Sequence, residues 1–386
     1  MTTHLFYNGE ILTAAGLLSG WALVEDGRIA SLGVGGMPTA MPNRTDLAGR
    51  LLAPGLIDVH AHGALGCDTM DASPESLRRM AGYYVQHGVT GFLATTMTGP
   101  QERIMAALGT IRQVMAEGTS GAALLGAHVE GPYLNRDKRG AQIDEQIRLA
   151  QRAEYIPLLD TGVVRLITVA PEYAENLALI REAVARGVTV AAGHTCATYD
   201  QMRLAVLQGV SQVTHLFNGL EPLHHRNPGV VGAALALDEV RCQLIADNIH
   251  LHPAVLKLAV RAKGVDRIVL VTDAMSGAGM PDGDYELGGQ RVIVRGGECR
   301  LEDGALAGST LTLDRAVRNI MRACGLSVEQ ALPMATRVPA EALGLAGRKG
   351  AIAVGYDADL IVIDREVNVS LVMVGGEIVY RSSAKP

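Results

Sequence analysis

The chain has 386 residues, 48% of them hydrophobic and 19% charged, and its formal net charge is −6. This composition is typical of a globular protein with a sizeable core and excludes a mainly disordered chain. The sequence shows no basic stripe and only 4% of its residues are aromatic, so we expect no nucleic-acid partner.

The N-terminal segment has no basic leader, and Glu10 interrupts it before a long apolar run develops. It therefore predicts no signal peptide and no membrane partner, and it favours a cytoplasmic location. The five cysteines are scattered along the chain without a Cys-x-x-Cys pair. This pattern argues against a disulfide framework and a thiolate zinc site, and it fits reduced thiols.

Short β-rich segments separated by turns occupy residues 1–52 and return in residues 346–386. The pairs Asp26-Gly27 and Gly375-Gly376 are two-residue hairpin signals within these segments. The Gly-rich residues 33–36 lack the strand and helix of a dinucleotide site, so we interpret them as a turn. We expect the two segments to pair into one small β domain.

Between these segments, in residues 53–345, apolar runs typical of strands alternate with longer stretches of helical character. Eight runs are predicted as strands, at residues 56–60, 89–95, 124–129, 163–169, 188–192, 212–215, 242–246 and 268–272. Their nearly continuous apolar character indicates burial on both faces, as in a parallel sheet covered by helices. The predicted fold class is α/β, a (β/α)₈ TIM-like barrel with a small β-sandwich domain built from both chain termini.

Two further features concern the connections. Ser73 is predicted to cap a helix that has Pro74 in its first turn and ends before Gly88. The Gly-rich residues 276–289, after the eighth strand, predict either a lid or a loose loop before a last helix near residues 310–324.

The first predicted strand ends in His60 and His62, in the stretch PGLIDVHAHG, and in an extended strand these side chains point to the same side. Taken alone, a pair of hydrogen-bonded structural histidines explains them as well as a metal site does. Barrel active sites, however, lie at the C-terminal ends of the strands. Four more candidate ligands occur at such ends, namely Glu130, His194, His215 and Asp273.

The coincidence of six such residues at one barrel mouth favours a metal centre over six separate structural roles. Histidine and carboxylate ligands suit a divalent ion such as zinc or iron, and six exceed the needs of one tetrahedral zinc. We therefore predict two ions per chain, with His60 and His62 on one, His194 and His215 on the other, and Glu130 bridging them. His128, which is deeper in its strand, is interpreted as a packed barrel histidine.

Six motifs occur in one order along essentially the whole chain: PGLIDVHAHG, HVEGPYL, AAGHT, THLFNGLEPLHHRNPG, ADNIHLHP and LVTDAM. Together they resemble the N-acetylglucosamine-6-phosphate deacetylase family of the amidohydrolase superfamily. The resemblance implies hydrolysis of the acetamide of N-acetyl-D-glucosamine 6-phosphate to D-glucosamine 6-phosphate and acetate. It places this reaction in amino-sugar catabolism and cell-wall recycling.

The resemblance also implies roles for individual residues. The metal ligands of the family fall on Glu130, His194 and His215, and its catalytic acid and base falls on Asp273. Because this chain keeps His60 and His62, it resembles the binuclear members. The contacts to the sugar phosphate would fall on Asn218, Gly219, Arg226 and His250, and the sugar would be lined by Ala307, Gly308 and Ser309.

Two implications concern the surroundings of the substrate. The loop of Arg226 often reaches a neighbouring subunit in this family, which implies a homodimer. Gln142 stands where part of the family has a histidine near the acetamide. A glutamine can donate a hydrogen bond but carries no charge, so the second metal is the alternative group to polarise the carbonyl.

The expected chemistry is hydrolysis by a metal-activated hydroxide, because a bound metal lowers the pKa of water from near 16 to about 7. Asp273 would take the proton from the attacking hydroxide and deliver it to the departing nitrogen. The alternatives are a deacetylase of N-acetylgalactosamine 6-phosphate or of an N-acyl amino acid, and a non-catalytic assembly protein. Arg226 favours a phosphorylated substrate, and the complete ligand set argues against a scaffold.

Overall fold

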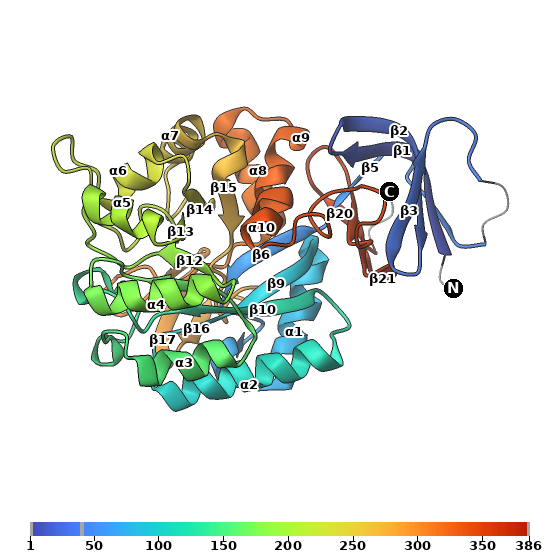
Figure 1. Cartoon of the computed structure of the whole chain (residues 1–386). Helices are drawn as coiled ribbons and strands as arrows, with labels where there is room; N and C mark the ends of the chain where they lie inside the picture. The colour runs from blue at the N-terminus through green and yellow to red at the C-terminus, as the bar shows by residue number, and fades with distance from the viewer. Residues whose placement is uncertain (1–2, 39–41, 384–386) are drawn as a thin grey trace.

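Eight apolar segments form parallel strands, and each strand pairs with the next one along the chain. The computed structural model describes residues 3–38 and 42–383 (Figure 1). The eight strands are β6 (Leu56–Ala61), β9 (Val89–Thr96), β10 (Ala123–Glu130), β11 (Val164–Val169), β12 (Thr189–Ala192), β13 (Val210–Val213), β14 (Arg241–Ile245) and β15 (Ile268–Val271). The predicted barrel is confirmed, because the segment that directly follows the last strand also pairs with the first strand.

The barrel closes at the C-terminal edge of β6, where three predicted ligands lie. The amide of Asp273 donates to the carbonyl of His60, and the amide of His62 donates to the carbonyl of Ala274, each over 2.8 Å. Ala61 and Ala274 form the corresponding parallel bridge. Closure of the sheet therefore brings residues that are more than 200 positions apart in the chain into contact.

The predicted and observed strands agree closely, with one shift that concerns the site. The sixth strand was predicted at residues 212–215, but β13 ends at Val213. His215 has a φ of 27°, outside the extended region, so its backbone cannot continue the strand. The core of the barrel contains fully buried side chains such as Phe92 and Leu166. Burial of each such side chain contributes about 1.5–3 kcal/mol.

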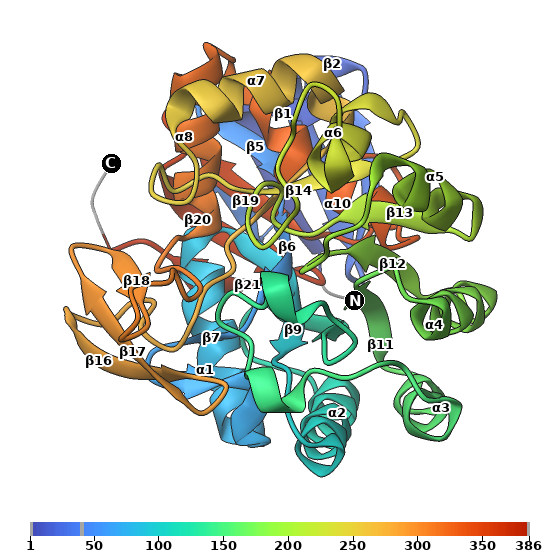
Figure 2. The same cartoon turned by 90° about the vertical axis from the view of Figure 1, so that its left-hand side faces the viewer.

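The longer helices of the barrel region surround the strands (Figure 2). They are α1 (Pro74–Tyr84), α2 (Gln101–Glu117), α3 (Arg152–Asp160), α4 (Ala174–Ala185), α5 (Tyr199–Leu207), α6 (Gly229–Ala236), α7 (Pro253–Lys263) and α8 (Leu313–Cys324). Ser73 caps α1 as predicted, accepting a hydrogen bond from the amide of Ser76. In the described ranges, we find no helix with the length and apolar character that a bilayer crossing requires.

Shorter elements complete the barrel region. After α8, the chain forms α9 (Val328–Ala331) and α10 (Arg337–Ala342). Two short strands pair near the mouth, β7 (Gly63–Ala64) and β8 (Cys67–Asp68). The 3₁₀ turns are η1 (Thr69–Asp71), η2 (Val85–His87), η3 (Arg136–Lys138), η4 (Asp144–Gln146), η5 (Val265–Arg267) and η6 (Leu332–Ala335).

Both ends of the chain contribute to a second sheet, which lies beside the barrel (Figure 1). Its strands are β1 (Thr3–Thr13), β2 (Gly16–Glu25), β3 (Arg28–Gly33), β4 (Arg44–Asp46), β5 (Leu51–Pro54), β19 (Leu360–Ile363), β20 (Val369–Val374) and β21 (Glu377–Arg381). Antiparallel pairing of β5 with β19 joins the two segments, as predicted. The sheet has its own hydrophobic core, which includes Phe6 and Met373.

Both hairpin predictions in this sheet are confirmed. Asp26 and Gly27 connect β2 to β3 with φ values of 47° and 79°, and Gly375 and Gly376 connect β20 to β21 with 56° and 84°. Positive φ at both central residues is the geometry of a type I′ turn, which matches the twist of paired strands.

The segment between β15 and α8 differs from the loose loop that was predicted for it. Residues 276–289 are not a loose loop, since they contain β16 (Gly283–Leu287), the first strand of an antiparallel meander. The meander continues with β17 (Gln290–Arg295) and β18 (Glu298–Arg300). Buried and exposed side chains alternate along β17, where Val292 and Val294 face inward. Alternation of buried and exposed side chains is the sequence signal of a strand. It was overlooked here because the neighbouring residues are rich in glycine.

Candidate metal centre

The six predicted ligands lie together at the C-terminal mouth of the barrel. Each is less than a tenth exposed, so water covers little of any of them. They form two groups, and within each group the ligand atoms lie within 4.8 Å of one another. One group is His60, His62 and Asp273, and the other is Glu130, His194 and His215. The two predicted histidine pairs fall in different groups, and Asp273, which the sequence assigned to neither ion, joins His60 and His62.

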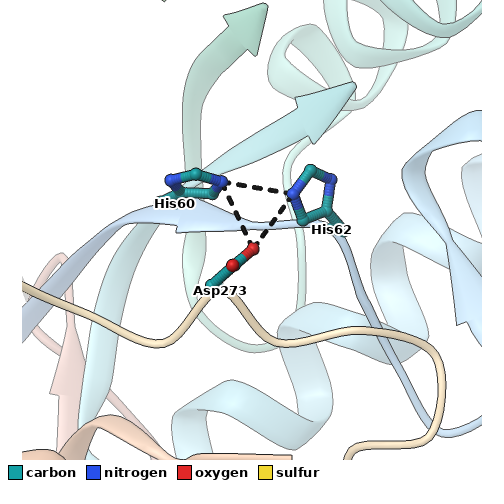
Figure 3. A group of neighbouring side chains, drawn as sticks. All are labelled: His60, His62 and Asp273. Carbon is teal, nitrogen blue, oxygen red and sulfur yellow. Dashed lines mark hydrogen bonds and ion pairs between the residues drawn. The ribbon is translucent and has the colours of Figure 1, made fainter. Parts of the chain in front are cut away.

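The first group brings together His60 on β6, His62 just after this strand, and Asp273, which follows β15 (Figure 3). Oδ1 of Asp273 lies 3.3 Å from Nε2 of His60 and 3.2 Å from Nε2 of His62. The two Nε2 atoms are themselves 3.2 Å apart. Three ligand atoms therefore point toward one small volume.

Glu130 connects the two groups. Its Oε1 lies 3.1 Å from Nε2 of His215, 3.4 Å from Nε2 of His194 and 3.5 Å from Nε2 of His60. Its Oε2 lies 3.4 Å from Nε2 of His62. This central position is the one that a bridging carboxylate requires.

The hydrogen bonds of the second group show that its donor set fits a cation. Nδ1 of His194 faces the carbonyl of Lys138 at 2.8 Å, and Nδ1 of His215 faces the carbonyl of Asn218 at 3.0 Å. A carbonyl only accepts, so each Nδ1 carries the proton and each Nε2 of a neutral ring presents a lone pair. The two Nε2 atoms lie 3.1 Å apart, beside the Glu130 carboxylate. A divalent metal ion satisfies such converging lone pairs.

In the first group, His60 is oriented in a similar way from inside the barrel, whereas the buried Nδ1 of His62 has no hydrogen-bond partner among the described residues. Nδ1 of His60 faces Oε1 of Gln243 at 3.2 Å, and the amide nitrogen of Gln243 donates to Gln212. Sequence reasoning missed Gln243, although a polar residue inside the apolar strand β14 is a recognisable signal. His128 is buried beneath His60 as predicted, its Nε2 lying 2.7 Å from the hydroxyl of Thr168.

The charges of the site favour ionised carboxylates. Burial raises the pKa of Asp273, but the neighbouring His60 and His62 outweigh burial and lower it to about 2. Burial also raises the pKa of Glu130, yet the surrounding histidines bring it well below its ordinary value. Both side chains are therefore anionic at neutral pH and available to bind a cation or to accept a proton.

Three of the ligands have strained backbone conformations. His194, His215 and Asp273 have φ values of 47°, 27° and 51°. Such conformations cost on the order of 1–3 kcal/mol each for residues with a Cβ and cluster at functional sites. The ring of His194 is closely surrounded, because a Cβ at Gly219 would lie 2.9 Å from its Nδ1. Packing thus holds the ring where the local backbone is unfavourable.

A cavity of about 310 Å³ opens over the two groups. Its volume is at the lower end of the range typical of small-molecule sites. Four of the predicted substrate contacts line it, namely Gln142, Asn218, Gly219 and His250. Five of the six predicted ligands, all except His60, line the same cavity as these contact residues.

The remaining predicted contacts lie elsewhere. Residues 307–309 are not among those lining the cavity, where Ala305 and Leu306 are found instead. The amide of Ser309 donates to the carbonyl of Asp273 over 2.7 Å, so this segment supports the Asp273 backbone. Arg226 is exposed and lines a separate hollow. Its guanidinium lies 2.7 Å from Nε2 of His225.

Gln142 has a role that the sequence did not predict. Its amide nitrogen donates to Oε2 of Glu130 over 2.8 Å, and its amide oxygen accepts from the amide of Thr98 over 2.9 Å. Gln142 therefore orients the central carboxylate while also facing the cavity. A contact with the substrate stays a prediction.

Comparison with known proteins agrees with this geometry. The family model described as the amidohydrolase family matches residues 51–379. The N-acetylglucosamine-6-phosphate deacetylase of Vibrio furnissii is 40% identical over 338 residues, which cover 87% of this chain and 84% of that protein. The N-acetylgalactosamine-6-phosphate deacetylase of Escherichia coli O157:H7 is 38% identical over 379 residues, which cover 97% of this chain and 99% of that protein.

A solved structure shares the whole fold. It is that of a variant N-acetyl-D-glucosamine-6-phosphate deacetylase from Mycobacterium smegmatis in complex with N-acetyl-D-glucosamine-6-phosphate. It superimposes with a TM-score of 0.92 at 33% identity, over 98% of this chain and 100% of that one. The chain therefore belongs to the amidohydrolase family, as a hydrolase of the N-acetylglucosamine-6-phosphate deacetylase group.

Proposed function

We propose that the protein hydrolyses the acetamide of N-acetyl-D-glucosamine 6-phosphate to D-glucosamine 6-phosphate and acetate. The observation that carries this proposal is a pair of adjacent ligand groups at the base of a cavity, with Glu130 of one group also contacting the histidines of the other. The similarity to deacetylases of this substrate supports the choice of sugar. The reaction would serve amino-sugar catabolism and cell-wall recycling in the cytoplasm.

We propose that two divalent ions, zinc or iron, bind to the two groups, with Glu130 between them. When bound, such ions acidify water to a pKa of about 7 and polarise the amide carbonyl. His60, His62, His194 and His215 would hold the ions through their Nε2 atoms. Gln142 keeps Glu130 aligned by its hydrogen bond to Oε2.

Asp273 is proposed as the proton shuttle. Its carboxylate lies in the cavity wall and is ionised, so it can take a proton from the attacking water. The same carboxyl group then delivers this proton to the departing nitrogen, which leaves as the amine. The leaving nitrogen must be protonated, because an amide anion is too basic to depart.

Recognition of the sugar phosphate is proposed to involve two subunits. Asn218, Gly219 and His250 line the cavity and can donate hydrogen bonds to the ligand. Arg226 is exposed outside the cavity of its own chain, which fits a role in the site of a neighbouring subunit. We therefore propose a homodimer in which Arg226 pairs with the 6-phosphate across the interface.

A second candidate substrate is N-acetylgalactosamine 6-phosphate. The similarity to an N-acetylgalactosamine-6-phosphate deacetylase covers nearly the whole of both proteins and favours it specifically. Acetate release measured with both sugar phosphates decides between them. The sugar with the higher kcat/KM is the substrate, and lack of acetate release from either would contradict the proposed function.

Arg226→Ala is expected to lower kcat/KM for the phosphorylated sugar by about tenfold to a hundredfold, since a charge-assisted contact contributes about 1.5–3 kcal/mol. Hydrolysis of unphosphorylated N-acetylglucosamine should change little. The control is Arg203→Ala, an exposed arginine on α5. Equal losses with both sugars would show that Arg226 has a structural role only.

A further inference from the structure

Glu172 stands just after β11, the fourth strand, whose end carries none of the six ligands. Its Oε1 accepts hydrogen bonds from the side-chain amide of Asn135, over 2.9 Å, and from the amide of Cys196, over 2.8 Å. Its Oε2 accepts a hydrogen bond from the hydroxyl of Thr195. One carboxylate thus connects the segments that follow the third and fifth strands.

The partners of Glu172 enclose the turn that carries His194. The carbonyl of His194 accepts a hydrogen bond from the amide of Asn135 over 2.9 Å. Thr195, the next residue, is fully buried, and its amide donates to the carbonyl of Gly219 over 3.2 Å. The backbone on both sides of His194 is therefore attached to neighbouring segments.

This attachment matters because the turn is unfavourable by itself. His194 has a φ of 47°, a left-handed conformation that a residue with a Cβ adopts only when its surroundings impose it. The hydrogen bond from Nδ1 to the carbonyl of Lys138 fixes the rotation of the ring. It does not fix the backbone from which the ring projects.

We propose that Glu172 is a positioning residue for the metal centre. By fixing Thr195 and Cys196, it holds the His194 turn so that Nε2 faces Glu130 and His215. The hydrogen bonds described for Glu172 all go to Asn135, Thr195 and Cys196. Its influence should therefore be confined to the ion of the second group. The inference rests on the proposed function, since it assumes that this group holds a metal.

The test is a chelator competition that measures the zinc affinities of the wild-type protein and of Glu172→Ala. One of the two ions should bind about 10–100-fold more weakly in the variant, as is typical when an outer partner of a ligand is lost. The affinity of the other ion should stay unchanged. Glu172→Gln keeps an acceptor oxygen for Asn135 and Cys196 and should restore most of the affinity. The matched control is Glu175→Ala, an exposed glutamate three residues further on.

The outcomes separate this inference from the proposed function. A wild-type protein that binds no zinc would contradict the metal centre and this inference with it. Wild-type zinc affinities in Glu172→Ala would overturn the positioning role alone, even if thermal stability fell. Should Glu172→Ala not fold, Thr195→Val removes the hydroxyl that donates to Glu172 and also accepts a hydrogen bond from the amide of Ala197. It should weaken the same ion, and an unchanged affinity there would overturn the inference.

Discussion

Asp273→Asn is expected to lower turnover by about 10²-fold or more while the protein keeps its metal. Asparagine preserves the size of the side chain and an oxygen that can face the ions, but it cannot accept a proton. In the wild type, Oδ1 of Asp273 lies 3.3 Å from Nε2 of His60 and 3.2 Å from Nε2 of His62, so an oxygen at this position can face an ion of the first group. Turnover should therefore fall while the metal content stays at the wild-type value.

The measurement compares acetate release with metal content determined by elemental analysis on the same sample. Asp303→Asn is the matched control, because Asp303 is an exposed aspartate between β18 and α8. If Asp273→Asn loses metal in proportion to its activity, Asp273 is mainly a ligand and the general base lies elsewhere. Near wild-type turnover with full metal would reject both roles.

Glu130→Gln should have the other large effect, because it removes the only carboxylate that contacts histidines of both ligand groups in the described residues. Loss of one partner from a buried charged cluster costs about 3–5 kcal/mol. Each 1.4 kcal/mol corresponds to tenfold in affinity, so metal binding should weaken by more than about 10²-fold. The introduced amide would also face the amide nitrogen of Gln142, which now donates to Glu130.

Equilibrium dialysis with zinc measures this loss directly. The control is Glu221→Gln, since Glu221 lies outside both ligand groups and pairs with Lys138 over 2.9 Å. Both ions should be affected, which distinguishes a bridging carboxylate from a ligand of one ion. A variant that loses one ion and keeps the other at wild-type affinity would contradict the bridging role.

The barrel and the clustering of the six candidate ligands were predictable because the signals for them are local. A strand that is buried on both faces consists almost entirely of apolar residues. β15, for example, is Ile-Val-Leu-Val. Once the strands are located, His60, His62 and Glu130 fall at their C-terminal ends, where barrels place their active sites. The position of His215 was correct although its strand ends earlier, because the residue that follows a strand still lies at the mouth.

Features that depend on contacts between distant loops were not predictable. Residues 307–309 were expected to line the sugar, yet hydrogen bonds hold Ser309 against the backbone of Asp273. The hydrogen bonds of Gln142 to Glu130 and of Glu172 to Thr195 likewise join segments that only the closed barrel brings together. The left-handed conformation of His194 could not be read from the residue type alone, because most histidines have a negative φ although histidine adopts positive φ more often than most other residues.

The central claim is that each chain holds two divalent ions through six side chains that meet at Glu130. Elemental analysis of the wild-type protein, purified without chelator under metal-replete conditions, tests this claim most directly. The account predicts two ions per chain. At most one ion per chain would contradict it, and would leave Glu130, His194 and His215 as a single site to which His60 and His62 are dispensable.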